Sequence, residues 1–345
     1  MTGFGARATG LFAAGACSAA AWWTVAHSRS TSGLGWAASE CAPRPFGRLW
    51  ARSAGGGDDA VVLLHGLIST GDVFGAVFDR LAWTHHLVVP DLLGFGRSMD
   101  EARESFDVEE HLDALDELAE RTGLFDSARW TLGAHSMGVS LALRWAARHP
   151  DRSVRVVGFG APVYRSPEQA RRHIAVSAMA RLFAFDTALA ERACALSCRH
   201  RAAAGWLSVV AEPRLPIPIA RAASMHTWPA YRDAVRHLVL DVDWAAALRA
   251  CDEHGIEVDL VWGGNDRIGD RAFAGQLIDA GRLSRLVVLE EGDHRLPLTH
   301  PTTCVEQLLS PHRPLHRTAL RSGRAKRRYL VVPTRAAAAE CDEHS

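Results

Sequence analysis

Short apolar runs alternate with helix-spaced apolar positions along the middle of this chain. The runs, which are typical of strands buried in a parallel sheet, lie at residues 61–64, 87–90, 130–134, 154–159, 256–262 and 286–289. Between them, the spacing of apolar residues predicts helices at 72–81, 107–121, 137–148, 272–280 and 302–309. This alternation predicts an α/β fold with a mostly parallel central sheet and helices on both faces.

The segment 161–242 interrupts this alternation. It contains no strong strand pattern, and it holds arginine-rich helical stretches at 169–185 and 188–206 followed by a proline-rich piece at 213–218. An insertion of about 80 residues is too long for a plain connection between a strand and the next helix. We therefore expect a helical cap that lies over the carboxyl ends of the strands.

The two ends of the chain differ from the core in composition. Residues 10–26 carry no charge but are few for a membrane-spanning helix, which needs about 20 residues. A signal peptide, a weak membrane anchor and a disordered alanine-rich tail all stay open for this segment. Residues 312–335 collect eight basic residues and no acidic one, which indicates a solvated tail or, alternatively, an interaction arm.

These patterns give a predicted domain organisation. It consists of an N-terminal extension (1–58), an α/β core (59–160 and 243–311), a helical cap (161–242) and a basic C-terminal tail (312–345). A cytoplasmic location is favoured, and export or membrane attachment through residues 10–26 stays open.

Composition narrows the function classes. The 345 residues are 48% hydrophobic and 23% charged with a formal net charge of zero, so no general attraction to nucleic acid is expected. The chain has no H-E-x-x-H pattern, no phosphate-binding loop and no G-x-G-x-x-G after a strand, and we expect no metal, nucleotide or flavin cofactor. The seven cysteines are scattered, and Cys194 and Cys198 are four residues apart, so they could share a helix face.

The most informative stretch is Ala134-His135-Ser136-Met137-Gly138, where a predicted strand meets a predicted helix. A serine at such a sharp turn exposes its hydroxyl group, and crowding of the backbone requires small neighbours. Ala134 stands where the G-x-S-x-G pattern has its first glycine, which makes the motif less specific. A serine that simply precedes a helix is the alternative interpretation.

Three further features fall at predicted strand ends. His65-Gly66-Leu67 follows the first apolar run, Gly263-Gly264-Asn265-Asp266 the penultimate one, and Gly292-Asp293-His294 the last. A serine is a weak nucleophile near neutral pH, so it needs a base within hydrogen-bond reach, and that base needs a partner that fixes its tautomer. The order serine, acid, histidine along the chain allows a sheet of this type to bring the three distant residues together.

These motifs, together with the turn at 91–98 (Asp-Leu-Leu-Gly-Phe-Gly-Arg-Ser) and His300-Pro301, resemble the α/β-hydrolase fold in its branch with a helical cap. The resemblance spans roughly residues 60–310. It implies that Ser136 is the nucleophile, Asp266 the orienting acid and His294 the general base. It also implies an oxyanion hole formed by the backbone N–H groups of Leu67 and Met137, the latter at a helix N-terminus.

Each assignment has an alternative. Asp270 competes with Asp266 and could instead cap the next helix. His300 competes with His294. His65 and His135 are open to a structural interpretation in which they hold turns through hydrogen bonds.

The resemblance implies a cofactor-independent serine hydrolase that cleaves a carboxylic ester of a small or medium-sized substrate through an acyl-enzyme. A thioesterase or carbon–carbon bond hydrolase is the alternative reaction, and a noncatalytic ligand-binding protein of the same fold is the alternative class. The expected partner is a small-molecule substrate, with membrane contact open through the N-terminal segment. The sequence leaves the oligomeric state undetermined.

Overall fold

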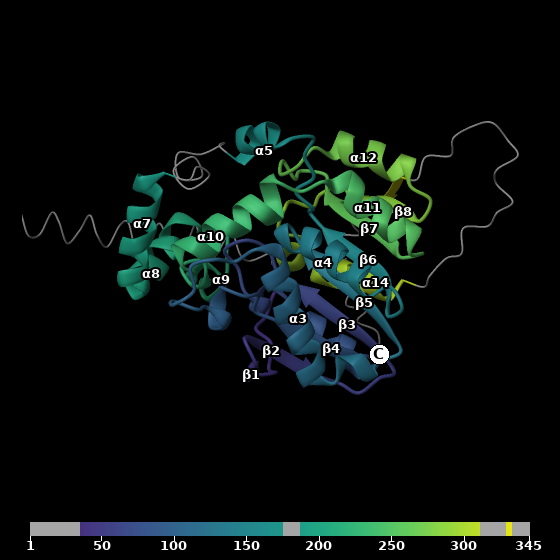
Figure 1. Cartoon of the computed structure of the whole chain (residues 1–345), viewed down its shortest axis with the longest axis horizontal. Coiled ribbons are helices and arrows are strands. Elements are labelled where there is room, and N and C mark those ends of the chain that lie inside the picture. Colours follow the sequence, from purple (N-terminus) through teal and green to yellow (C-terminus); the bar gives the residue numbers. More distant parts are fainter. Residues whose placement is uncertain (1–34, 175–186, 311–328, 333–345) are drawn as a thin grey trace, which may run out of the picture.

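A computed structural model describes residues 35–174 and 187–310 and the backbone of 329–332. Within these residues nine strands form one sheet in the order β1-β2-β4-β3-β5-β6-β7-β8-β9 (Figure 1). They are β1 Arg44–Phe46, β2 Leu49–Ala54, β3 Asp59–Leu64, β4 His86–Pro90, β5 Arg129–His135, β6 Ser153–Phe159, β7 Glu257–Gly263, β8 Ser284–Leu289 and β9 Tyr329–Val332. Strands β3 to β9 pair in parallel and β1 and β2 pair antiparallel, which confirms the predicted mostly parallel sheet.

Helices cover both faces of the sheet because successive strand residues point to opposite sides. On β3, Val62 and Leu64 belong to the apolar core under α3, α4, α11 and α12, whereas Val61 and Leu63 belong to the core under α2 and α14. The helices are α2 Ala76–Asp79, α3 Val108–Thr122, α4 Met137–Arg148, α11 Trp244–Glu253, α12 Arg271–Ala280, α13 Leu296–Thr299 and α14 Pro301–Leu309. All of the strand runs predicted from the sequence are strands in this sheet.

The sheet extends past both predicted boundaries of the core. The hairpin of β1 and β2 lies before residue 59, where the sequence suggested an extension, and β9 lies in the region interpreted as a basic tail. The sequence pattern does not indicate strand β2, because its fourth residue, Arg52, is charged and yet buried. Residues 10–26 lie outside the described part of the chain.

The helix predicted at 72–81 is wrong. The structure has the 3₁₀ turns Gly71–Val73 and Arg80–Trp83 with the short helix α2 between them. The break falls at Gly75, whose backbone is extended (φ −73°, ψ −164°), and the next amide, of Ala76, donates to the carbonyl of Ala37. A long-range backbone bond therefore replaces the helical continuation.

The segment between β6 and α11 is mostly helical within the residues that the structure describes. Its elements are α5 Pro167–Ile174, α7 Ala188–Arg199, α8 Arg201–Ala211, α9 Ile217–Ala222, α10 Trp228–Val235 and a π-helical turn Arg236–Leu240. The stretch predicted as one helix at 188–206 is broken at His200, and the end of the stretch predicted at 169–185 lies outside the described residues.

Helices α7, α8 and α9 lie together at one end of the molecule (Figure 1). Several hydrogen bonds connect the inserted segment to the core. Among them, the Gly96 N–H donates to Met225 O (2.8 Å), and the Ser140 hydroxyl donates to Leu238 O (2.8 Å). Among the helices that the structure describes, none combines the length and apolar character needed to cross a membrane.

Candidate active site

Ser136 occupies a strained turn between β5 and α4. Its φ of +52° and ψ of −122° lie outside the ordinary regions for a residue with a side chain. The strain is maintained from both sides, because the Ser136 N–H donates to Phe159 O on β6 (2.9 Å) and α4 begins at the next residue. Gly138 has no room for a side chain: a Cβ there would lie 2.6 Å from His65 O. The turn therefore holds the serine side chain in one direction.

The structure brings Ser136, His294 and Asp266 into one hydrogen-bonded line. The Ser136 hydroxyl lies 3.0 Å from His294 Nε2, and His294 Nδ1 lies 2.9 Å from Asp266 Oδ2. The side chain of Asp266 is fully buried and that of His294 is about a quarter exposed (0% and 25%). Because an aspartate at Nδ1 accepts the N–H, the lone pair of Nε2 faces the serine hydroxyl, which is the tautomer that a general base requires.

Glycines allow the acid and the histidine to approach each other. Asp266 follows β7 in a turn closed by its N–H and Gly263 O (3.0 Å), and its Oδ1 accepts the Ile268 N–H (2.8 Å). Gly160, at the end of β6, has a φ of +61°, and a Cβ there would lie 3.1 Å from both Asp266 Oδ2 and His294 Nδ1. A side chain at this glycine would press on the pair.

The residues that the sequence left as alternatives, Asp270 and His300, lie outside this hydrogen-bonded line. Asp270 caps α12 by accepting the Phe273 N–H (2.9 Å), as the alternative interpretation of that residue held, and it also binds Gln169. His300 contacts the Thr299 hydroxyl (2.9 Å) at the start of α14. Asp293 pairs with Arg295 and accepts its backbone N–H (2.8 Å).

His65 holds the loop that follows β3. The ring is fully buried: its Nε2 accepts the Leu92 N–H (2.8 Å) and its Nδ1–H donates to Gly66 O (2.7 Å). Burial lowers the pKa of His65, so the neutral ring with this tautomer is the stable form. Gly66 then passes close to the serine, since a Cβ on it would lie 3.1 Å from Ser136 Cβ.

Two backbone N–H groups, those of Leu67 and Met137, belong to the two segments that meet at Ser136. No other described residue accepts a hydrogen bond from the N–H of Leu67 or Met137. Met137 begins α4, where the first amides lack partners within the helix. Ile68, next to Leu67, has a φ of +49°, which is unfavourable for a β-branched residue and marks a second strained position beside the serine.

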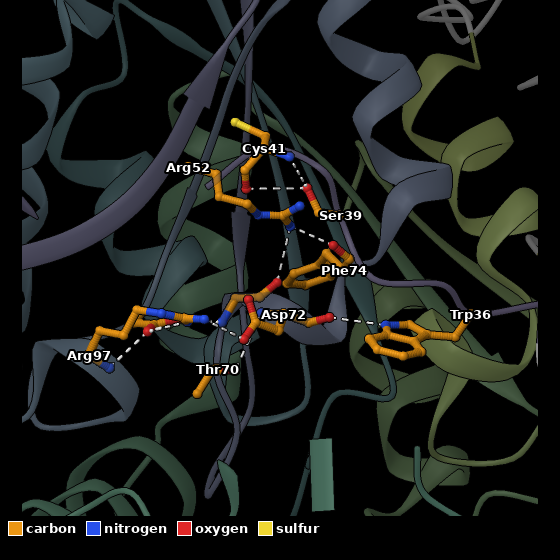
Figure 2. A network of polar contacts seen from close by, with 10 residues as sticks. Trp36, Ser39, Cys41, Arg52, Thr70, Asp72, Phe74 and Arg97 are labelled. Carbon is orange, nitrogen blue, oxygen red and sulfur yellow. Dashed lines mark hydrogen bonds and ion pairs between the residues drawn. The ribbon is translucent and has the colours of Figure 1, made fainter. Parts of the chain in front are cut away.

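A network of polar contacts anchors the loop that follows β3 (Figure 2). Asp91 accepts the Gly71 N–H (2.8 Å) and the Arg97 N–H (2.8 Å), and the Arg97 guanidinium joins Asp91 to Asp72 (3.1 and 2.8 Å). Buried Arg52 donates to the carbonyls of Gly71 and Phe74. The sequence identified Asp91 and Arg97 only as part of a matching motif, and their function of anchoring the loop was missed.

His135, next to Ser136, supports His294. Its Nε2–H donates to the backbone carbonyl of His294 (2.8 Å), and the two rings are 5.0 Å apart. Burial and the neighbouring His294 lower the pKa of His135 to about 3, so it stays neutral near pH 7. This contact fits the structural interpretation that the sequence left open for His135.

The fold and this arrangement define a class of protein. A sequence profile of the alpha/beta hydrolase family matches residues 61–307, and the chain belongs to this family.

Named relatives are distant and match only part of their own length. "Lipase 3" of Moraxella sp. (strain TA144) is 32% identical over 92 residues, covering 27% of this chain and 28% of the relative. "Probable lysophospholipase BODYGUARD 2" of Arabidopsis thaliana is 29% identical over 115 residues, covering 32% of this chain and 24% of the relative. Among solved structures, E-2-(acetamidomethylene)succinate hydrolase superposes with a TM-score of 0.59 at 18% identity, covering 78% of this chain and 98% of that one.

Proposed function

We propose that this protein is a serine hydrolase that cleaves a carboxylic ester of a small or medium-sized substrate through an acyl-enzyme. The observation that carries the proposal is the hydrogen-bonded line from Ser136 (3.0 Å) through His294 (2.9 Å) to Asp266. The lipase and lysophospholipase names of two distant relatives agree with ester substrates.

In the proposed mechanism Ser136 attacks the carbonyl carbon while His294 Nε2 takes the hydroxyl proton. Asp266 accepts the Nδ1–H throughout and stabilises the imidazolium that forms. The oxyanion receives hydrogen bonds from the N–H groups of Leu67 and Met137, which have no other described acceptor. His294 then protonates the leaving group and activates a water molecule that releases the acid.

We further propose that the helical segment 161–242 acts as a cap that shapes the substrate site. Its contacts at Met225 O and Leu238 O join it to the Gly96 turn and to α4, both near the nucleophile turn. Under this proposal the chain length of the acyl group is selected by cap residues. Turnover of a series of p-nitrophenyl esters and matching thioesters measures that selection, and it separates an esterase from a thioesterase.

The nucleophile is tested with Ser136→Ala. We expect turnover of a p-nitrophenyl ester to fall by about 10⁴-fold or more with unchanged circular dichroism, because the attacking oxygen is removed while the fold is kept. Labelling by a fluorophosphonate probe should disappear in the same variant. Asp270→Asn is the matched control, since Asp270 lies outside the line, and it should keep the labelling.

Two results would contradict the proposal. Near-normal turnover by Ser136→Ala would assign the reaction to another residue. Absence of fluorophosphonate labelling in well-folded unaltered protein would favour a noncatalytic ligand-binding function.

A further inference from the structure

Helix α7 of the inserted segment carries two thiols on one face. Cys194 and Cys198 are one helical turn apart, and their sulfur atoms are 3.9 Å from each other. In an α-helix the Cα atoms of residues four apart are about 6 Å apart, which is within the range that a disulfide can bridge. Neither thiol belongs to the hydrogen-bonded line of Ser136.

We propose that Cys194 and Cys198 form a redox-active thiol pair that closes reversibly into a disulfide within α7. This inference concerns a modification site and stands independently of the proposed hydrolase function.

The environments of the two thiols suit different steps of disulfide formation, namely attack on the oxidant and resolution to the disulfide. Cys198 is partly exposed, and Cys194 is buried with 2% of its surface accessible. The hydrogen bond from Cys194 and the nearby Arg201 guanidinium lower the pKa of Cys198. The same hydrogen bond and burial raise the pKa of Cys194. Cys198 is therefore the attacking thiol, since thiolates are the reactive form, and Cys194 is the resolving thiol.

The carbonyl of His226 remains satisfied when Cys198 ionises. This carbonyl oxygen accepts a hydrogen bond from the protonated thiol of Cys198 (3.2 Å from Sγ) and another from Arg201 Nη1 (3.0 Å). Loss of the thiol proton removes one of these two donors and leaves the bond from Arg201 in place. The thiolate would then face this carbonyl oxygen, and the hydrogen bond from Cys194 and the charge of Arg201 oppose the resulting repulsion.

The arrangement fits a thiol pair better than a metal site. His226 is the third group near the sulfurs, with Nδ1 4.0 Å from Cys194 Sγ. That nitrogen lies 3.2 Å from Thr227 O, and because a carbonyl only accepts, Nδ1 carries a proton and cannot ligate a metal. Within the described residues no group of three or more His, Cys, Asp or Glu side chains is arranged to hold a metal ion.

The oxidation balances with a hydroperoxide as the oxidant. The Cys198 thiolate attacks one peroxide oxygen, so that an S–O bond forms, the O–O bond breaks, and the leaving oxygen takes up the proton released by Cys198. Cys194 then loses its proton and attacks the Cys198 sulfur, so that the S–S bond forms, the S–O bond breaks, and hydroxide leaves and becomes water with that proton. The two thiols give up two electrons, and the hydroperoxide is reduced to water and an alcohol, or to two waters.

Helix geometry makes this disulfide easy to reduce. The Cβ atoms of residues four apart on a helix are about 5–6 Å apart, whereas a relaxed disulfide needs about 3.5–4.5 Å. Closure must therefore distort α7 locally, and strained disulfides have higher reduction potentials than structural ones. The bond would act as a reversible modification rather than a permanent staple.

A distortion at Cys198 would act on residues near Ser136. The backbone of His226, whose carbonyl contacts Cys198, pairs with Phe95, and the two rings are 6.2 Å apart. Phe95 in turn packs edge-on against His65, with ring centres 6.0 Å apart. We expect disulfide closure to change hydrolytic turnover through this chain of contacts, an expectation that does rest on the proposed function.

Peptide mapping tests the thiol pair directly. Both cysteines fall in one tryptic peptide, residues 193–199, bounded by Arg192 and Arg199. After hydrogen peroxide treatment and iodoacetamide, we expect this peptide to lack alkyl groups and to be lighter by two hydrogen atoms. Dithiothreitol before alkylation should restore two alkyl groups. The partly exposed Cys41, on a different peptide, is the internal control and should stay alkylated at the same peroxide dose.

Variants separate the two thiols. Cys198→Ser should abolish oxidation of the peptide, and Cys194→Ser should leave Cys198 as a sulfenic acid that dimedone traps. Circular dichroism checks that both variants fold. The proposal is overturned if the peptide remains doubly alkylated while Cys41 is oxidised, or if Cys198 proceeds to sulfinic acid without a disulfide in unaltered protein.

Ester turnover is measured on the same oxidised and reduced samples. A change in turnover that is absent in Cys194→Ser supports the coupling to Ser136. A closed disulfide with unchanged turnover would remove that coupling and leave the thiol pair standing. A protein without any ester turnover would count against the proposed function alone, because the peptide map does not depend on it.

Discussion

His111 is a polar residue in an apolar position. It lies on α3 with 1% of its surface exposed, and neither ring nitrogen has a partner among the described residues. Burial lowers its pKa to about 4. We expect His111→Leu to raise the free energy of unfolding by about 1 kcal/mol at pH 7.5, because unpaired buried polar atoms are removed. Urea unfolding measures the change.

The control for this prediction is His254→Leu. His254 is exposed in the turn after α11, so its replacement should change the urea midpoint little. A loss of stability in His111→Leu would show that the ring makes a contact that an aliphatic side chain cannot replace.

The candidate site residues that the structure brings together were predictable where local sequence marks them. Ser136, Asp266 and His294 each follow a strand in a turn with glycine nearby, so their common edge of the sheet could be inferred. The partner of His65 could not, because the Leu92 N–H is 27 residues away and is brought to the ring only by the β3–β4 pairing. Long-range backbone contacts leave no periodic signal in the sequence.

At the scale of elements, the β5–α4 turn depends on a close approach to β3. A Cβ on Gly138 would lie 2.6 and 2.7 Å from the carbonyl oxygens of His65 and Leu64, and neither backbone oxygen can rotate away. We expect Gly138→Ala to cost about 1–3 kcal/mol of stability by overpacking and to lower ester turnover at least tenfold. Urea unfolding and a p-nitrophenyl ester assay measure both effects.

Ala134→Gly is the matched change two residues before the serine. Ala134 lies in β5 and its φ is not positive, so glycine is not needed there for conformational reasons. The variant should lose about 0.5–1 kcal/mol of stability, because glycine destabilises the interior of a strand. Its ester turnover should be at least as high as that of the unaltered protein. A large loss of turnover would give the Ala134 methyl group a function of its own.

Helices and strands were predicted well where one periodicity of apolar residues dominates the sequence. They were predicted poorly where a long-range contact overrides that periodicity. Helix α4 begins and ends as expected because its apolar face and the Ser136 turn agree. Strand β2 was missed because buried Arg52 is neutralised by Asp79 (2.9 Å), a partner that only the fold supplies. The same network explains why the stretch at 71–83 forms short turns instead of one helix.

At the scale of the molecule, four histidine rings are largely removed from solvent in the folded protein. His65, His111, His135 and His226 are all buried or nearly so and have pKa values lowered chiefly by burial, to about 4 for His111 and about 3 for His135. A histidine with a lowered pKa in the folded state stays neutral there while the unfolded chain takes up a proton below about pH 6.5. Acid therefore favours unfolding.

We expect these buried histidines to make the free energy of unfolding fall as the pH drops below 6.5. Each fully buried histidine contributes a slope of about 1.4 kcal/mol per pH unit until its folded pKa is reached. For His111 that window runs from 6.5 down to about 4. Urea midpoints at pH 7.5, 6 and 5 measure the slope, and His111→Leu should make it shallower. A stability that rises on acidification would mean that these rings are charged in the folded protein, which their burial opposes.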